Sequence, residues 1–278
     1  MKRILVFYGY FDRWDKMYNR DELIPYIHEL IDDVILMKDI DSLKKYLLVD
    51  GIANKNYIMP SQVNHIHELN EAGIKSMITV NSEQLRFLED KKSFAYYVHR
   101  NRLTEFFPKY YNKFSDRKGD QLVILKPRDS TFSYGIYKKK LCEVEDWEFS
   151  NHVIQEYIYD NKEYDGVIVA NKGEVTFGFA YVCEFDTDNY IKFQNEKPNF
   201  KSIKKIMMDD KIKSMFSKIL KPCLYTGTCC FDYKVKNDKL YVFEINPRLD
   251  GALASPWNKD NLGEVIRESI KIYDADNN

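Results

Sequence analysis

Two short segments near the end of the chain alternate apolar with polar residues, as strands do when they bury one face. Residues 231–236 read FDYKVK and residues 241–246 read YVFEIN. Successive side chains on a strand point to opposite faces, so each segment is predicted to turn one row of side chains toward a core. Asn237 and Asp238, between the segments, are typical turn residues. The sequence therefore predicts a β-hairpin here.

The register of this hairpin is fixed if the two apolar rows share one face. The pairs predicted on that face are Phe231 with Ile245, Tyr233 with Phe243, and Val235 with Tyr241. On the other face, Asp232 is then opposite Glu244, and Asn246 lies two residues further along. Two carboxylates a few ångströms apart repel each other unless a cation lies between them. Because all three ligands offer oxygen, Mg²⁺ or Mn²⁺ is the expected metal.

The alternative for the hairpin is a solvated face whose acids and lysines keep an edge strand soluble. A lone Asp or Glu is commonly of that kind. A solvated face, however, explains neither Asn246, two residues after Glu244, nor Arg248, four residues after Glu244. The combination of oxygen ligands with an arginine therefore favours a binding site.

The run Glu244-Ile245-Asn246-Pro247-Arg248, preceded by Asp232, resembles the metal-binding signature of the ATP-grasp superfamily. That superfamily includes D-alanine ligase, biotin carboxylase, carbamoyl phosphate synthetase and many carboxylate-amine ligases. Its members bind ATP between two α+β subdomains and phosphorylate a carboxylate, after which an amine or another nucleophile displaces phosphate. The resemblance implies a metal site of Asp232, Glu244 and Asn246. It also implies that Arg248 binds the substrate carboxylate or the acyl phosphate.

Two basic residues upstream match the positions where the family binds phosphate. Asp90-Lys91, followed by Phe94, resembles the first of them. The apolar run 122–125 ends in Lys126, which matches the second. A lysine set in such a low-dielectric wall binds phosphate more strongly than a lysine in water. The alternative is a lysine that reaches into solvent from a strand end. The resemblance implies that both lysines contact ATP and that Lys126 takes part in catalysis.

The family also carries a loop of small residues that closes over the phosphates with its backbone N–H groups. Residues 128–136 stand at that place and read RDSTFSYGI. Ser130 and Ser133 are expected to assist the backbone donors. The loop departs from glycine-rich versions, because Gly135 is its only glycine. This departure is the best support for a nucleotide-binding module that has lost turnover.

The adenosine end of the site is expected in residues 155–163. By resemblance, Gln155, Glu156 and the backbone of Tyr157 and Ile158 form the hinge that contacts adenine. Glu163, seven residues after Glu156, would accept the ribose hydroxyls, since a carboxylate can take two O–H donors. The alternative is an ordinary strand followed by an acidic turn. The order of this segment after the two lysines favours the nucleotide site.

The expected fold class is α/β and α+β, an ATP-grasp fold with a small α/β unit at its N-terminus. That unit would span 1–88, with strands at 4–8, 34–37, 57–59 and 77–80 and helices between them, which implies a parallel sheet. One of these helices is expected to begin near Ser61 and end at Gly73. The ATP-grasp part would span 89–278, with a lid at about 113–157 and a metal-binding part at about 158–278. Amphipathic helices are predicted over 201–220 and 261–273.

The composition indicates neither a nucleic-acid nor a membrane partner. The net charge is −1 at pH 7, and no stretch approaches the roughly 20 apolar residues of a membrane span. The 5 cysteines are odd in number and lack a Cys-x-x-Cys spacing. This fits a reducing cytosol better than a disulfide framework, so a cytoplasmic location is expected.

The predicted function is an ATP-dependent carboxylate ligase, with a small-molecule carboxylate and an amine as substrates and with Mg²⁺ or Mn²⁺. It would form an acyl phosphate and release ADP and phosphate. The alternatives are the activation of bicarbonate, as in carboxylases and carbamoyl phosphate synthetase, and the module without turnover. The resemblance allows a homodimer, since family members are often dimers, but nothing in the sequence shows an interface. The sequence does not identify the carboxylate or the nucleophile, because the residues that choose them lie on loops.

Overall fold

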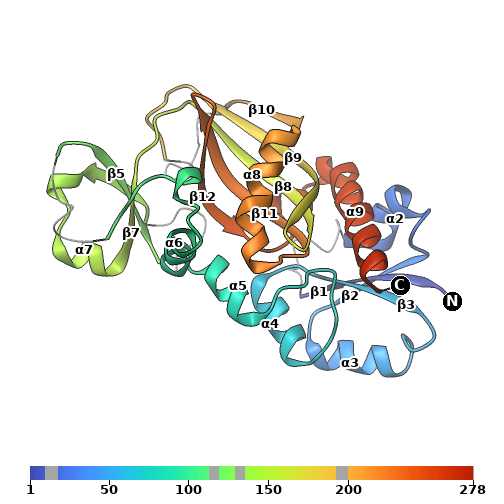
Figure 1. The fold of residues 1–278 in the computed structure, drawn as a ribbon. Coiled ribbons are helices and arrows are strands. Elements are labelled where there is room, and N and C mark those ends of the chain that lie inside the picture. Colours follow the sequence, from blue (N-terminus) through green and yellow to red (C-terminus); the bar gives the residue numbers. More distant parts are fainter. Residues whose placement is uncertain (10–17, 113–118, 129–134, 192–199, 278) are drawn as a thin grey trace.

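Three β-sheets organise the part of the chain that the structure describes (Figure 1). The computed structural model describes residues 1–9, 18–112, 119–128, 135–191 and 200–277. Ser130 and Ser133, both predicted to contact ATP, lie outside these ranges. The described residues contain no helix with the length and apolar character needed to pass through a lipid bilayer.

The first sheet, here called the amino-terminal sheet, is parallel. Its strands are β1 (Arg3–Tyr8), β2 (Asp33–Met37) and β3 (Lys55–Pro60), in the order β2-β1-β3. Its helices are α2 (Arg20–Ile27), α3 (Ile40–Leu48) and α4 (Val63–Glu71). Side chains of β1 alternate between two cores, with Leu5 packed in the cluster of α2 and Val6 in the cluster of α3. Burial on both faces explains the continuous apolar run of β1.

The prediction of a fourth strand at 77–80 was wrong. This segment makes an isolated antiparallel bridge, in which Thr79 and Thr226 exchange backbone hydrogen bonds of 2.8 and 3.1 Å. Met77, Ile78 and Val80 are buried in the main core. The apolar run therefore reflects burial between two sheets, and a short buried run looks like a strand in sequence.

The second sheet, the core sheet, is antiparallel in the order β10-β9-β8-β11-β12. Its strands are β8 (Lys162–Asn171), β9 (Glu174–Phe185), β10 (Phe200–Met207), β11 (Gly227–Lys236) and β12 (Lys239–Asn246). Helix α8 (Asp210–Leu220) covers one face, where Phe216 stacks on Phe231 with ring centroids 4.1 Å apart. Helix α9 (Lys259–Asn277) reaches the opposite face, where Asn261 bonds the hydroxyl of Tyr181.

The predicted helix over 201–220 was wrong in its first half and right in its second. Residues 200–207 form β10, an edge strand paired with β9, and α8 begins only after Asp209, whose carboxylate accepts a hydrogen bond from the Ile212 N–H at 2.8 Å. The apolar residues of β10 stay largely in solvent, with Ile203 57% exposed. The spacing of these apolar residues resembles that of an amphipathic helix, but the segment is a strand because it pairs with β9.

The third sheet, the outer sheet, has the order β4-β7-β5-β6 and lies at the far end of the molecule in Figure 1. Its strands are β4 (Tyr110–Tyr111), β5 (Leu122–Pro127), β6 (Tyr137–Lys140) and β7 (His152–Glu156), and α7 (Asp146–Asn151) packs beside it. A separate small core that includes Val123, Leu125 and Leu141 holds it together. Helices α5 (Ser82–Glu89) and α6 (Lys91–Arg100) connect the amino-terminal sheet to β4.

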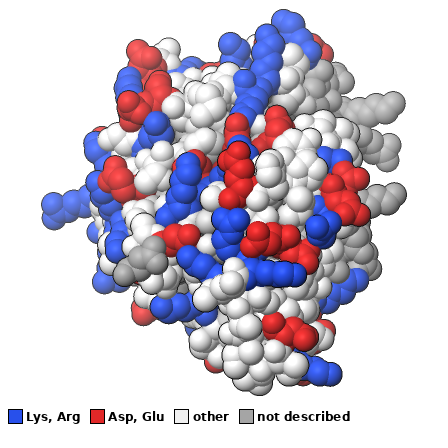
Figure 2. All heavy atoms as spheres, turned by 90° about the vertical axis from the view of Figure 1, so that its right-hand side faces the viewer, with Lys and Arg blue, Asp and Glu red and all other residues white. Residues whose placement is uncertain are grey.

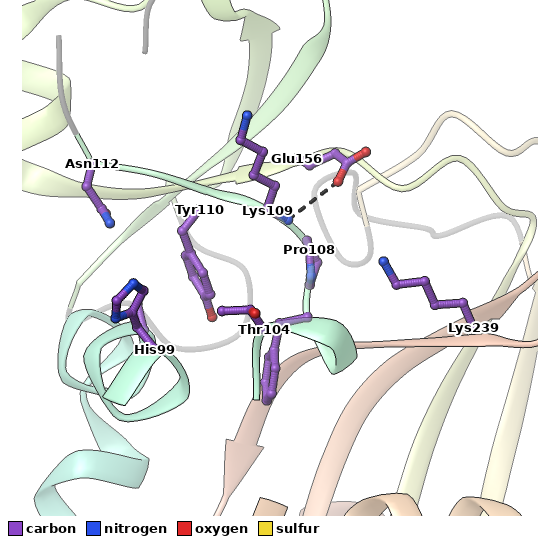
Figure 3. A pocket seen from close by; sticks show the side chains of 10 residues that line it. His99, Thr104, Pro108, Lys109, Tyr110, Asn112, Glu156 and Lys239 are labelled. Atoms are coloured by element: carbon purple, nitrogen blue, oxygen red, sulfur yellow. Dashed lines mark hydrogen bonds between the residues drawn. The ribbon is translucent and has the colours of Figure 1, made fainter. Parts of the chain in front are cut away.

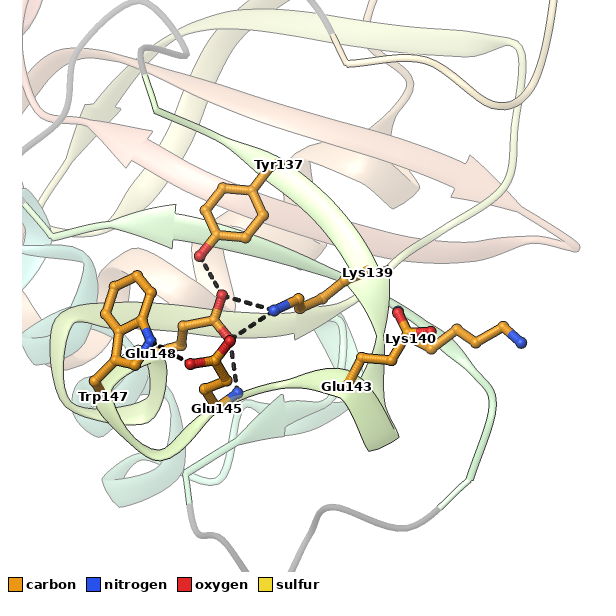
Figure 4. A network of polar contacts seen from close by, with 7 residues as sticks. All are labelled: Tyr137, Lys139, Lys140, Glu143, Glu145, Trp147 and Glu148. Carbon is orange, nitrogen blue, oxygen red and sulfur yellow. Dashed lines mark hydrogen bonds and ion pairs between the residues drawn. The ribbon is translucent and has the colours of Figure 1, made fainter.

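A buried carboxylate ties α7 to the outer sheet (Figure 4). Glu148 is 2% exposed and accepts hydrogen bonds from the Tyr137 hydroxyl at 2.5 Å, the Lys139 ammonium at 3.0 Å and the Glu145 backbone N–H at 2.6 Å. Burial alone would raise the pKa of Glu148, but these donors together hold it below its usual value. The ionised form is thereby favoured in the folded protein.

Glu148→Gln is expected to cost about 2 kcal/mol of stability at pH 7, because a charged acceptor of several donors is lost. The folded-state pKa of Glu148 is lowered, so its contribution is present above the unfolded pKa of about 4.3 and disappears as the pH falls through the folded value. Urea unfolding at pH 7 and pH 3 measures this, and the gap between wild type and variant should narrow at pH 3. Glu143→Gln, at an exposed acid in the short 3₁₀ helix that follows β6, is the control. A gap that stays constant with pH contradicts the account.

Positive and negative side chains are mixed on the face that carries α2 and α9 (Figure 2). Several of them pair across elements, as Lys259 of α9 does with Glu22 of α2. A nucleic-acid-binding face instead concentrates the positively charged side chains of Lys and Arg. This face therefore lacks the electrostatic character of such a surface.

Candidate active site

The predicted acidic pair forms where β11 and β12 lie side by side. Asp232 is paired with Glu244, and Phe231 with Ile245, as the apolar pattern predicts. The amide nitrogen of Asn246 lies 3.4 Å from Asp232 Oδ2 and 3.5 Å from Glu244 Oε1. These three side chains share one face of the core sheet, so that part of the register is confirmed. They converge on one point, which is the arrangement an oxygen-bound cation requires.

Arg248 extends the same cluster. One of its nitrogens donates to Asn246 Oδ1 at 3.4 Å, and another donates to the Leu249 carbonyl at 3.0 Å. Because the guanidinium is held from two sides, its fork has a defined direction beside the acidic pair. An arginine fork binds a carboxylate or phosphate more specifically than a lysine does.

A β-bulge changes the rest of the predicted register. Between Asp232 and Tyr233 the pairing shifts, so that Tyr233 lies opposite Val242 instead of Phe243. Val242 is therefore fully buried, whereas Phe243 is only half-buried. The predicted pairs of Tyr233 with Phe243 and Val235 with Tyr241 were wrong. The bulge places the Phe243 ring 5.2 Å from the Lys126 ammonium, at the site rather than in the core.

Lys126 brings the outer sheet to the acidic pair. It lies near the end of β5 and is 7% exposed. Burial lowers the pKa of Lys126, and the nearby charge of Glu244 opposes that effect. For Glu244, burial alone would raise the pKa, but the charges of Lys126 and Lys91 and hydrogen bonds bring it below its usual value. The two sheets thus bring opposite charges together, and the region between Lys126 and the acidic pair is called the cleft below.

Lys91 reaches the cleft because a capped helix begins there. Asp90 accepts a hydrogen bond from the Ser93 N–H at 2.7 Å and fixes the first turn of α6, whose first residue is Lys91. Arg128 directly follows β5, and its guanidinium lies 3.4 Å from the Asp90 carboxylate. This contact places the start of α6 next to the end of β5, where Lys126 lies.

The side chains of Gln155 and Glu156 at the end of β7 point to opposite faces. Gln155 is 1% exposed and shares the face of Lys126, because β7 pairs with β5 in that register. Its Oε1 has no hydrogen-bond partner within the described ranges. Glu156 turns away, and its Oε2 is 3.4 Å from the Lys109 N–H. The amide of Gln155, not the carboxylate of Glu156, thus faces the cleft.

The backbone of the hinge is partly occupied by the protein itself. The N–H groups of Glu156 and Tyr157 donate to the carbonyls of Lys109 and Leu122 at 2.8 and 3.1 Å. These two donors are therefore already used. Ile158 follows, and its carbonyl accepts a hydrogen bond from Lys234 at 3.0 Å. Glu163, at the start of β8, accepts one from the Tyr190 hydroxyl at 3.3 Å.

A pocket of about 300 Å³ opens beside the hinge (Figure 3). Its lining comes from α6, from residues 104–112 around β4, and from Glu156 and Lys239. In Figure 3 the side chains of His99 and Tyr110 line one part, and Lys239 approaches from the core sheet. The Glu156 side chain therefore belongs to this pocket.

Solved structures of known enzymes share this architecture. D-alanine–D-alanine ligase from Bacillus anthracis, complexed with ATP, aligns with a TM-score of 0.60 and 15% sequence identity over 99% of this chain and 99% of that chain. Biotin carboxylase from Campylobacter jejuni aligns with a TM-score of 0.59 and 16% identity over 98% of this chain and 65% of that chain. L-amino acid ligase from Bacillus licheniformis aligns with a TM-score of 0.56 and 11% identity over 92% of this chain and 69% of that chain.

These proteins are ATP-grasp enzymes. The chain has the ATP-grasp fold. No family model and no curated protein matches the sequence. At these identities the structural likeness shows the fold alone, so the chemistry of the site has to be argued from its own residues.

Sequence reasoning missed Lys234, which lies on the cleft face of this ATP-grasp core. It is 3% exposed and donates to the carbonyls of Ile158 and Asp160, each at 3.0 Å. Burial lowers the pKa of Lys234 to about 8. The alternation in 231–236 carries a signal, because it puts Lys234 on the same face as Asp232. Tyr190 was also missed, and no local pattern marks it.

The donor set fits a hard divalent cation. Asp232 and Glu244 offer carboxylate oxygens, whereas the Asn246 amide turns its nitrogen toward them and its oxygen toward Arg248, so it would have to rotate to offer an oxygen ligand. Among the described residues no group of three or more His, Cys, Asp or Glu side chains could hold a metal by itself. A cation at this point would therefore need further oxygen ligands, which nucleotide phosphates and water supply in Mg²⁺ sites.

Proposed function

We propose that this protein is an ATP-dependent carboxylate ligase that forms an acyl phosphate and transfers the acyl group to an amine, with release of ADP and phosphate. One observation carries the proposal. The acidic pair of Asp232 and Glu244 on the core sheet faces buried Lys126 on the outer sheet, and this lysine helps to hold the Glu244 pKa down. Anionic ligands for a metal and a cation for phosphate are thus presented to the same cleft.

The residues divide the work by charge. Lys91 and Lys126 hold the nucleotide phosphates, and Arg248 orients the substrate carboxylate. Mg²⁺ or Mn²⁺, held by Asp232, Glu244 and Asn246, would neutralise charge on the phosphates. Buried Gln155 offers its amide to the nucleotide, and Glu163 accepts the ribose hydroxyls. This assignment differs from the sequence prediction at Glu156, whose side chain lines the hinge pocket.

The reaction proceeds in two displacements. A carboxylate oxygen attacks the terminal phosphorus of ATP, the bond from that phosphorus to the bridging oxygen breaks, and ADP leaves. The amine then attacks the acyl carbon, and phosphate leaves with the carboxylate oxygen. Two anions must meet in the first step, so positioning and charge neutralisation are the main contributions of the protein. Lys126 can neutralise charge in this step, because its ammonium is buried and little water screens its electric field.

We propose that the outer sheet serves as the lid, in a lid region of about 113–157, and that 158–278 carries the metal. The wider division into 1–88 and 89–278 is part of the same proposal. The small separate core of the outer sheet supports it, since a unit with its own core can move as a body. A cytoplasmic location is part of the same proposal, and light scattering of the purified protein tests whether it forms the homodimer that is common among family members.

Bicarbonate activation is the second candidate, because bicarbonate is also an anion that the same site could present to ATP. It would use the same cations and the same acidic pair. The two candidates differ in the anion that stimulates ATP cleavage, so one assay separates them.

The test is a screen of carboxylate and amine pairs, with bicarbonate as a separate arm, for production of ADP and phosphate with Mg²⁺ or Mn²⁺. We expect a carboxylate to stimulate phosphate release and an amine to increase it further. Stimulation by bicarbonate alone supports the second candidate. Nucleotide binding without stimulated release supports a module without turnover, and formation of AMP and pyrophosphate contradicts the acyl-phosphate route.

A further inference from the structure

An aromatic side chain of the protein itself lies beside Glu163, the carboxylate proposed for the ribose. Tyr190 comes from the segment that follows β9, and its ring stacks on Phe185 with centroids 3.6 Å apart and an interplanar angle of 20°. The Lys234 ammonium lies 4.5 Å from the centre of the Tyr190 ring. A flat ring is therefore packed between an aromatic surface and a cation, in a way that also suits a purine.

The hydroxyl of Tyr190 lies on the carboxylate proposed for the ribose. It donates to Glu163 Oε2 at 3.3 Å. Burial, and next the charge of Glu163, raise the pKa of the Tyr190 phenol, so the hydroxyl keeps its proton at neutral pH. Glu163 thus has an O–H donor of the same kind that a ribose would bring.

The backbone of Tyr190 is held by the hinge. The hydroxyl of Tyr157 accepts a hydrogen bond from the Tyr190 N–H at 2.9 Å and donates to the Tyr190 carbonyl at 2.8 Å. On the other side, Lys138 of the outer sheet donates to Asn189 Oδ1 at 2.6 Å. The segment therefore bridges the hinge and the outer sheet, which are the two parts that must admit a nucleotide.

We propose that Tyr190 is an internal occupant of the nucleoside site, a substitute for the base and ribose that must leave the cleft before a nucleotide binds. The inference rests on the proposed function, because it assigns Glu163 to the ribose. The ring of Tyr190 stacks on Phe185, and its hydroxyl donates a hydrogen bond to Glu163. When a nucleotide binds, its base and its ribose would replace these two contacts. The contact with Glu163 is long for an O–H donor and a carboxylate, so it is readily given up.

The consequence is a lowered apparent affinity for nucleosides, without any effect on the phosphate end. If the occupied state outnumbers the open state about tenfold, the apparent dissociation constant rises about tenfold. Removing the ring removes this competition. A residue that instead formed a permanent wall for the base would have the opposite effect when removed, since base stacking is lost.

Isothermal titration of the full-length protein with MgADP and, separately, with inorganic pyrophosphate tests the proposal. Tyr190→Ala should bind MgADP about tenfold more tightly than wild type and bind pyrophosphate equally well. Tyr190→Phe keeps the ring and loses the hydroxyl, so its affinity for MgADP should lie between those of wild type and Tyr190→Ala. Tyr96→Ala, at a tyrosine that is 59% exposed on α6, is the matched control and should behave as wild type. Weaker or unchanged MgADP binding by Tyr190→Ala overturns the proposal, and so does an equal change for both ligands.

A second measurement separates this inference from the proposed function. The contact between Tyr190 and Glu163 is tested without nucleotide by thermal unfolding of Tyr190→Phe, Glu163→Gln and the double variant. Non-additive effects on Tm support the contact, and additive effects overturn it. Non-additive effects in a protein that binds neither MgADP nor pyrophosphate leave the contact in place and refute the nucleotide site itself.

Discussion

Glu244→Gln is expected to lower carboxylate-stimulated phosphate release at least ~10²-fold, the scale of removing one electrostatic stabiliser. The carboxylate of Glu244 faces Asp232 across the hairpin and is kept ionised by Lys126 and Lys91. Glutamine has nearly the same shape but lacks the charge that attracts a divalent cation. Turnover measured at saturating ATP over a range of Mg²⁺ concentrations checks this, and a higher Mg²⁺ requirement should accompany the loss.

The fold of this variant should be retained, because glutamine can keep the hydrogen bond with Asn246. Circular dichroism and Tm therefore accompany the kinetics. Glu174→Gln, at an acid paired with Lys221 on the surface of the same sheet, is the control and should keep full turnover. Unchanged turnover in Glu244→Gln would refute the metal assignment.

Lys126→Met is expected to weaken MgADP binding about 10- to 100-fold, which corresponds to the loss of one or two charge-assisted hydrogen bonds. Methionine keeps the length and apolar character of the side chain in its buried place, but it offers no charge to the phosphates. Lys126 also helps to lower the pKa of Glu244, so that pKa should rise in the variant. Turnover should fall with affinity, since the same charge acts in both.

The measurement is titration with MgADP, together with phosphate release. Lys204→Met, at an exposed lysine of the edge strand β10, is the control, because it removes the same charge far from the cleft. Loss of affinity in both variants would point to a general effect of charge. Wild-type affinity in Lys126→Met would show that the cleft binds phosphate elsewhere, and would contradict the assignment.

The acidic pair could be predicted from the sequence because a local rule governs it. Alternation in two neighbouring strands places Asp232 opposite Glu244, and the short turn between the strands holds the register over the pairs that matter. Helix α9 was predicted for a similar reason, since its apolar stripe is long and regular. Such features depend on residues close in the chain.

Other features depend on residues far apart in the chain and were missed. The bulge that turns Phe243 toward Lys126 arises because Val242 fills the core instead, a choice that packing makes and alternation does not reveal. Strand β10 exists because β9 offers it an edge, although its own apolar spacing suits a helix. Tyr190 meets Glu163 only after the core sheet has formed. Tertiary pairing overrides local pattern in each case.

The most direct test of the account follows the oxygen atoms of the carboxylate that stimulates phosphate release. With that carboxylate labelled with ¹⁸O, an acyl phosphate must pass one labelled oxygen to each orthophosphate released, because the amine displaces phosphate at the acyl carbon. Mass spectrometry of the phosphate measures this. We expect singly labelled orthophosphate, formed in the same amount as ADP. Unlabelled orthophosphate, or the label in AMP with pyrophosphate as the second product, would contradict it.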